Sequence, residues 1–489
     1  MKKFKLLMGA AILALALVVV TAPADAHSWA VALDLIGVKV CNFNYGMVWN
    51  GVNTWANTGW NTTSGGDSDT GNATATASVS TDENSNSTGV FIWEMGGGPV
   101  AMNRGKGVAI AADATLVGVC NFNHGMVFNW VSTGANSGHN VTGGEMIGGE
   151  GHHGHHGHHG PDMDGVESNT GNATAKATVS TSLNSNSTTV AICDFENGPM
   201  AVNWERRHRG RCGGGGCGPL AVALDLTAVK VCNFNSGMVM NMVDTWANTG
   251  WNTTSGGDSD TGNARATASV DTTMNTNGTC VMVKEGGSGA LAMNKGRRGG
   301  LAIALEADLV KVSSANMGFV LNLVGTSANT GHNTTSGGDS DTGSAVASAS
   351  VVNDVNSNST FVGIMGSDGA AAINGGSTHV RVPCDGCVDV CDPDGVVAVN
   401  DGKGVAIAAD VDAVSVSNTN VADVVNVVDT SANSGNNDTG GDDCDCKSGC
   451  GDHHDKDEGG DSTTGNASAS STVENTVNSN STTVVIGGM

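Results

Sequence analysis

The amino-acid sequence predicts an all-β fold of tandem repeats, either a β-solenoid or an elongated stack of separate β-repeats, with long surface loops. Three observations support this prediction. One sequence unit occurs five times, each unit contains strictly alternating small residues, and each unit is interrupted at the same two places. Internal repetition of this kind is typical of proteins in which each repeat contacts only its neighbours.

The first residues have the features of a secretory signal peptide. Three lysines within the first five residues are followed by an apolar stretch, Ala10–Val20, and by a small-residue cleavage sequence, Ala24–Ala26. This order of features is typical of export signals. We see no later apolar run long enough to cross a bilayer, so we expect no membrane span after cleavage. The expected location is secreted or at the extracellular surface, and an uncleaved anchor is the alternative.

The composition is strongly acidic and poor in large side chains. The net charge is −25, glycine accounts for 72 of 489 residues, and aromatic residues make up 4 %. Such a charge repels nucleic acid and anionic membranes and attracts cations. We therefore expect no nucleic-acid partner. The scarcity of large side chains predicts a thin core of alanine and valine.

Three landmarks define the repeats: NTG or NSG, TGNA or a variant, and NSN or NTN. The second and third are always 13 residues apart, whereas the first and second are 14, 35, 14, 14 and 32 residues apart. A constant interval indicates packed structure, and a variable one indicates a surface loop. The first landmark begins at Asn57, Asn136, Asn248, Asn329 and Asn433. The glycine of the second landmark is Gly71, Gly171, Gly262, Gly343 and Gly465. The third landmark begins at Asn84, Asn184, Asn275, Asn356 and Asn478. After a signal peptide at 1–26, the predicted repeats are 27–104, 105–217 with His-rich and Arg/Cys-rich insertions, 218–298, 299–403 with a Cys-rich insertion, and 404–489 with a Cys/Asp/His insertion.

Each TGN segment is followed by a predicted strand with one small apolar face. In the first repeat Ala73, Ala75, Ala77 and Val79 alternate with threonine and serine, and the other repeats follow the same pattern. Alternation with period two predicts a β-strand that lies on a core. Alanine also favours helices, but the interleaved threonine, serine and valine and the flanking glycine and asparagine favour a strand.

A second strand region precedes each NTG landmark, as in AVALDLIGVKVCNFN from Ala30. Its cysteine, replaced by serine in two repeats, occupies one fixed position, which we interpret as a small buried strand position. The segments 100–110 and 397–407 predict hairpins between repeats, the latter on an Asn-Asp-Gly turn. We expect each repeat to supply two or more coils of a solenoid, with the NTG and NSN triplets at corners where their amides stack into ladders.

The short variable loops carry pairs of aspartates in a Gly-rich turn. Carboxylates two residues apart bring hard oxygen ligands together, as in calcium loops. The remaining ligands of an EF-hand are missing, and aspartate in a glycine turn is also ordinary turn chemistry. The candidate calcium ligands are Asp67, Asp69, Asp258, Asp260, Asp339 and Asp341.

The expanded loops of the second and fifth repeats contain softer ligands at the same point of the repeat. Neutral imidazole and thiolate bind Zn, Ni or Cu. A low-complexity expansion is the alternative, and for CxxC segments of an exported protein so is a local disulfide. The predicted metal ligands are His152, His153, His155, His156, His158, His159, Cys444, Cys446, Cys450, His453 and His454, together with Cys384, Cys387 and Cys391 in a turn between repeats.

The segment GNATATASVSTDENSN resembles the curlin repeats of bacterial surface amyloid fibres, which place G-N-x-A before alternating small residues and close on asparagine. The similarity covers about sixteen residues per copy and lacks the regular glutamines of curlin units. The resemblance implies a secreted, self-associating protein with stacked strands, and it implies no site residues.

The sequence favours a secreted or cell-surface structural or adhesive protein. Its partners would be further copies of itself or cell-surface components, and the protruding loops would bind divalent metals. The alternatives are an extracellular metal-sequestering protein on a β-repeat carrier and, third, a polysaccharide-active enzyme on a repeat scaffold. We see no catalytic motif, and because most features recur in every repeat, we expect no enzyme.

Overall fold

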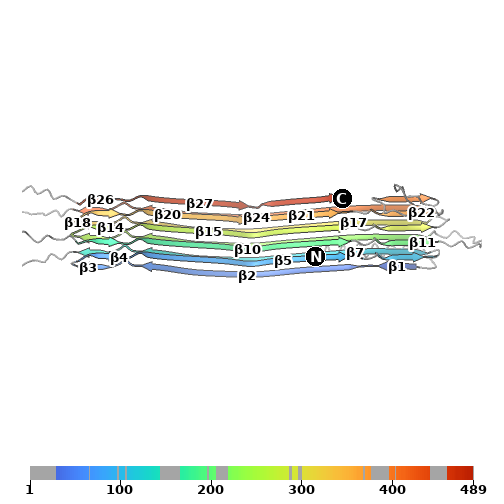
Figure 1. Cartoon of the computed structure of the whole chain (residues 1–489), viewed down its shortest axis with the longest axis horizontal. Coiled ribbons are helices and arrows are strands. Elements are labelled where there is room, and N and C mark those ends of the chain that lie inside the picture. The colour runs from blue at the N-terminus through green and yellow to red at the C-terminus, as the bar shows by residue number, and fades with distance from the viewer. Residues whose placement is uncertain are drawn as a thin grey trace, which may run out of the picture.

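The structure is a computed structural model that describes residues 29–64, 66–95, 98–104, 107–143, 166–194, 198–204, 219–285, 289–295, 300–366, 369–375, 396–401, 404–440 and 460–487. It is a flattened β-solenoid with five coils stacked in parallel (Figure 1), and the colour passes from blue to red across the stack in sequence order. The described part contains no helix that is long and apolar enough to cross a membrane.

Two long sheets face each other across the interior, and three shorter sheets lie at the ends of the coils. The first long sheet contains β1 (Trp29–Leu33), β2 (Ile36–Asn57), β7 (Val108–Asn136), β12 (Leu220–Asn248), β17 (Leu301–Asn329) and β24 (Val405–Asn433). The second contains β5 (Ala73–Glu94), β10 (Ala173–Asp194), β15 (Ala264–Glu285), β20 (Ala345–Val355) with β21 (Asn358–Met365), and β27 (Ala467–Val477) with β28 (Asn480–Gly487).

The shorter sheets continue the same stack. At one end of the coils lie β6 (Val100–Asn103), β11 (Met200–Trp204), β16 (Leu291–Lys295), β22 (Ala371–Gly375) and β23 (Val397–Asp401). Two corner sheets lie at the other end. They are formed by β3 (Thr62–Ser64), β8 (Val141–Gly143), β13 (Thr253–Ser255), β18 (Thr334–Ser336) and β25 (Asp438–Gly440), and by β4 (Ser68–Thr70), β9 (Ser168–Thr170), β14 (Ser259–Thr261), β19 (Ser340–Thr342) and β26 (Ser462–Thr463).

Each repeat forms one coil, not the two or more that we predicted. Asn57 pairs with Asn136, and the same landmark continues in register through Asn248, Asn329 and Asn433. The two alternating segments of a repeat therefore lie in opposite sheets of the same coil. This continuous register confirms the solenoid and excludes a row of separate domains.

The segments predicted to be hairpins are corners between sheets. β6 pairs with β11 and β7 pairs with β12, so the two arms of the first such turn belong to different sheets. The prediction was wrong because a turn signal between apolar runs does not distinguish a hairpin from an arch that joins two layers. We predicted that Asn400 begins the turn of the second hairpin. Its side chain instead connects the two sheets, because its Nδ2–H donates to the carbonyl of Gly404, which directly precedes β24.

The alternating alanines line the interior, as predicted. Ala73 and Ala75 are buried and Thr74 between them is exposed, and their counterparts stack with them into an alanine layer. A separate valine layer contains Val90, Val117 and their counterparts. Small side chains on both faces allow the two long sheets to approach closely, so a thin core suffices for an elongated stack.

Asparagine ladders run between these apolar layers. In one ladder the Nδ2 of Asn50 donates to Oδ1 of Asn129 at 2.8 Å, and Asn129, Asn241, Asn322 and Asn426 continue the series at 2.7 Å per step. Amides stacked in register satisfy one another, so they can be buried without an unpaired polar group. The ladders predicted for the NTG and NSN asparagines are also present, as between Asn136 and Asn57 at 2.8 Å and between Asn84 and Asn184 at 3.0 Å.

The NSN triplet lies inside a strand and not at a corner, contrary to our prediction. Asn84 has φ 59° within β5, and the equivalent Asn356 separates β20 from β21. Asparagine tolerates this left-handed conformation better than other non-glycine residues. The resulting bend is held by a ladder, in which the Nδ2 of Asn84 donates to Oδ1 of Asn184 at 3.0 Å.

The NTG landmarks do form corners. A Cβ at Gly138 would lie 2.0 Å from the carbonyl oxygen of Gly250, so only glycine permits the observed coil spacing there. The following residue has positive φ in every repeat, and its rings stack in the order Trp60, His139, Trp251 and His332. Stacking therefore accounts for the aromatic ring at this position in the first four repeats, and the fifth repeat has Asn436 there.

Candidate assembly interface

The predicted soft-metal ligands lie outside the residues that the structure describes. They are His152, His153, His155, His156, His158, His159, Cys384, Cys387, Cys391, Cys444, Cys446, Cys450, His453 and His454. Their assignment to Zn, Ni or Cu stays a prediction. Among the described residues, no group of three or more His, Cys, Asp or Glu is placed to hold a metal ion.

The predicted calcium ligands form two columns along the corner. Oδ1 of Asp67 accepts the backbone N–H of Glu167 at 3.0 Å, and Asp258 and Asp339 repeat this contact at 2.9 and 2.8 Å with the next coil. These carboxylates therefore cap amides of neighbouring coils, which is turn chemistry. The second column contains Asp69, Asp260 and Asp341, all exposed.

The second column carries unfavourable charge repulsion. Desolvation of its carboxyl by the surrounding corner, together with the nearby Asp341 and Asp258, raises the pKa of Asp260 although its side chain is exposed. Stacked carboxylates without a cation repel one another, and this repulsion favours the protonated form. A bound cation would relieve that repulsion, so calcium stays a prediction for this corner.

The cysteines of the first long sheet point outward, which corrects our prediction of a buried position. Cys41 is exposed, and Cys120 and Cys232 are partly exposed in register with it. Burial and the neighbouring thiols raise the pKa of Cys120 to about 11. The sequence reasoning failed because the amides Asn42 and Asn44, not the apolar residues beside them, occupy the interior positions.

An interior column of carboxylates was missed by the sequence analysis. Asp113, Asp225, Glu306 and Asp410 stack in register between the sheets. Burial and the neighbouring carboxylates raise the pKa of Asp225 well above its usual range. The available signal was an acidic residue at one fixed place in an otherwise apolar segment of the repeats.

The outer surface of the first long sheet is apolar over much of its area, and we call it the outer apolar face. Phe43, Tyr45 and Trp49 are 66 %, 72 % and 74 % exposed. Rings of successive coils contact one another, with centroids 6.0 Å apart for Phe43 and Phe122 and 4.7 Å apart for Phe122 and Phe234. The face consists of Phe43, Tyr45, Met47, Trp49, Phe122, His124, Met126, Phe128, Trp130, Phe234, Met238, Met240, Met242, Ala315, Met317, Phe319, Leu321, Leu323, Val421, Val425 and Val427.

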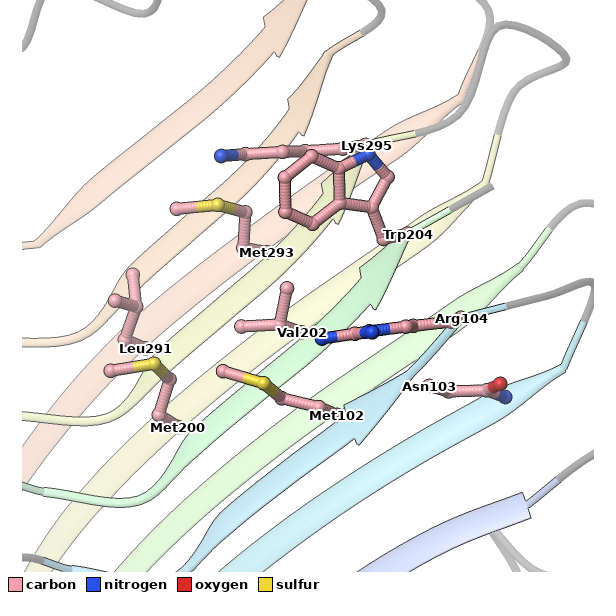
Figure 2. A pocket seen from close by; sticks show the side chains of 9 residues that line it. All are labelled: Met102, Asn103, Arg104, Met200, Val202, Trp204, Leu291, Met293 and Lys295. Atoms are coloured by element: carbon pink, nitrogen blue, oxygen red, sulfur yellow. The ribbon is translucent and has the colours of Figure 1, made fainter. Parts of the chain in front are cut away.

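A shallow groove lies on the outer surface of β6, β11 and β16 (Figure 2). Its volume is about 370 Å³, and methionine, leucine and valine side chains form its floor. Trp204 stands beside it, with Nζ of Lys295 5.3 Å from the ring centroid, and Arg104 lies at the other margin. The lining contains no carboxylate, histidine, serine or cysteine that could act together with Lys295, so we assign the groove no catalytic role.

The two ends of the stack are open within the part of the chain that the structure describes. There, β2 pairs only with β7 at one end, and β24 pairs only with β17 at the other. At the second end the interior side of β27 is uncovered, so that Val473 is 44 % exposed whereas its counterpart Val179 is fully buried. Unpaired edges and uncovered interior positions are sites for further strand addition.

Comparisons with protein-family models, with curated proteins and with solved structures found no match to this chain. The geometry of the stack is therefore the basis for the functional argument.

Proposed function

We propose that this chain is an exported structural protein of the cell surface that assembles head to tail into fibres. In such a fibre the first coil of one copy adds to the last coil of another, and the stack continues. The unpaired edges of β2 and β24 support this proposal, because each presents backbone groups that another parallel strand satisfies.

The direction of the amide ladders is the observation that carries the proposal. In the ladder that begins at Asn50, each Nδ2 donates toward the following coil, so Asn50 Oδ1 is the acceptor end and Asn426 the donor end. The ladder at the corner runs the other way, from Asn433 to Asn57. Head-to-tail addition joins donor to acceptor in both ladders. Head-to-head addition would oppose like groups in both.

The interior layers of the first and last coils also match. Val38 and Val40 of the first coil and Val414 and Val416 of the last belong to the same valine layer, at opposite ends of the stack. Repetition by translation does not close into a ring, so a contact of this type produces an open filament. The resemblance to curlin repeats agrees with this assembly.

Charges placed at the open end test the proposal. In the V473K/V477K variant the lysines lie at positions that a single copy leaves partly exposed but that a fibre buries. Burial of an unpaired ammonium costs several kcal/mol, so we expect at least a hundredfold loss of polymer. The matched control T472K/T476K changes the outward side of the same strand and should polymerise normally.

Electron microscopy and sedimentation of the chain without its signal peptide provide the measurement. Filaments of the unchanged chain and of the control, but not of V473K/V477K, are expected. Monomeric behaviour of the unchanged chain at all concentrations, or normal filaments from V473K/V477K, would overturn the proposal.

A further inference from the structure

The outer apolar face exposes more apolar surface to water than a soluble monomer usually does. Its columns are about 6.6 Å apart along a parallel strand, and the coils are about 4.8 Å apart. Five columns on five coils therefore cover roughly 30 by 24 Å, or about 700 Å². The residues of the outer apolar face occupy most of these positions, and Gly51, Ser236, Thr419 and Asp423 occupy the others. A patch of this size exceeds what soluble monomers usually expose and approaches the roughly 800 Å² that each partner buries in a stable complex.

The two margins of the face carry opposite charges. On one side lies the column of Lys39, Lys230 and Lys311, and on the other side lie Asp244 and Asp429. Lys230 and Asp244 belong to the same strand, β12, with the apolar columns between them. A two-fold operation that reverses the strand direction and keeps the coils level therefore brings one lysine opposite one aspartate, Lys230 and Asp244, at each margin of the contact.

We propose that the outer apolar face packs against the same face of a second copy, related by a two-fold axis parallel to the direction of stacking. This axis reverses the strand direction and keeps the stacking direction. When it passes between the columns of Tyr45 and Met47, Lys230 lies opposite Asp244 of the second copy. This inference rests on the proposed function in one respect only: if the chains form head-to-tail filaments, lateral pairing joins two of them into a double filament.

Side-chain size also fits this arrangement. The same axis places the column of Phe122 opposite the column of Phe128, and the small side chain of Cys41 opposite Gly51. Face-to-face sheets pack about 10 Å apart with interdigitating side chains. The strands of successive coils run side by side with little twist (Figure 1), so contact extends over all five coils.

The face is continuous with the proposed fibre axis. Met47, Met126, Met238 and Phe319 form one column along the stack, which ends in Asp423 on the last coil, and head-to-tail addition would repeat this column from copy to copy. Each added copy then contributes the same area to the lateral contact. Attachment to a lipid surface is the competing use of the face, and the net charge of −25 opposes attachment to anionic membranes.

The test uses the end-blocked V473K/V477K chain, so that lateral pairing is measured apart from fibre growth. We expect this chain to sediment as a dimer. F122S/F128S in the same background should weaken dimerisation at least a hundredfold, whereas F91S/F361S, the same change on the outer surface of the second sheet, should not. Hydrogen exchange of β10 checks that the variants remain folded.

A charge exchange tests the orientation. K230E and D244K should each weaken the dimer about tenfold, and K230E/D244K should restore it to within about threefold. A monomer at all concentrations, loss of pairing in F91S/F361S, or no recovery in the double exchange would overturn the inference. Capture of the end-blocked chain by neutral lipid vesicles in place of dimerisation would also overturn it.

The two proposals fail in distinguishable ways. Single-width filaments from the unchanged chain would support fibre growth and refute lateral pairing. Discrete dimers of the unchanged chain without filaments would do the opposite.

Discussion

The stability of the stack should depend on each interior amide ladder, and Asn241 is the sharpest place to test this. Its side chain is fully buried, donates to Asn322 at 2.7 Å and Thr272 at 3.2 Å, and accepts from Asn129 at 2.7 Å. We consider Asn241→Leu, which preserves the approximate volume and removes only the amide. The change therefore isolates the ladder from cavity effects.

The magnitude follows from the three neighbours that lose a partner. Oδ1 of Asn322 and Oγ1 of Thr272 each lose the donor that Asn241 supplies, and Asn129 keeps Thr181 at 3.1 Å but loses one of its two acceptors. A buried polar group left unsatisfied costs about 1–3 kcal/mol, so we expect about 4 kcal/mol of local destabilisation in total.

Hydrogen exchange resolved to peptides is the suitable assay, because repeat proteins open locally and not as one unit. The loss of protection should centre on β12 and β17. Asn53→Leu, the same replacement at an exposed outward position, should change protection by less than about 0.5 kcal/mol. Destabilisation below about 1 kcal/mol for Asn241→Leu would refute the view that the ladders hold the coils together.

Three further predictions concern the corner, the interior carboxylates and the loops. Gly138→Ala should destabilise the corner by about 1–3 kcal/mol, because its Cβ would overlap the next coil, whereas Gly143→Ala has open space; urea denaturation compares the two. Because the pKa of Asp225 is raised in the fold, its stabilising contribution is complete below the ordinary carboxyl pKa and is lost as pH rises through the folded value. The urea midpoint should therefore be higher at pH 4 than at pH 7, and Asp225→Asn should reduce this difference; an unchanged difference would contradict the assignment. Deletion of residues 144–165 and 441–459, which spares the corner strands β8, β25 and β26, should lower Zn, Ni or Cu bound to protein purified without affinity resin at least tenfold, as measured by elemental analysis, and equal metal content would refute loop binding.

Much of the scaffold was predictable from alternation alone. The Ala73 series identified an interior face, because period two has only one structural meaning in a segment flanked by glycine and asparagine. The constant interval also placed the packed segments correctly, whereas the expanded segments of the second and fifth repeats lie outside the described residues. Alternation is a local property that a single repeat shows, and the intervals follow from comparing the five copies.

Pairing and side-chain direction were not predictable in the same way. The interior position of Asn42 contradicts the usual burial of apolar groups, and Phe43 is correspondingly outside. Such an inversion is favourable only when identical amides stack in register across coils, which is a property of the assembled fold. The same dependence explains why Cys41 was predicted to be buried, and why the number of coils per repeat was not evident.

The register also has a consequence for spacing along a fibre. The insertions in the second and fifth repeats leave the stacking of the long strands unchanged, since Asn136, Asn248, Asn329 and Asn433 stay aligned. Five coils at about 4.8 Å advance the axis by about 24 Å. In a head-to-tail polymer, each inserted segment would therefore recur once per copy along the fibre axis. Its spacing would be set by the five coils and would not depend on its own length.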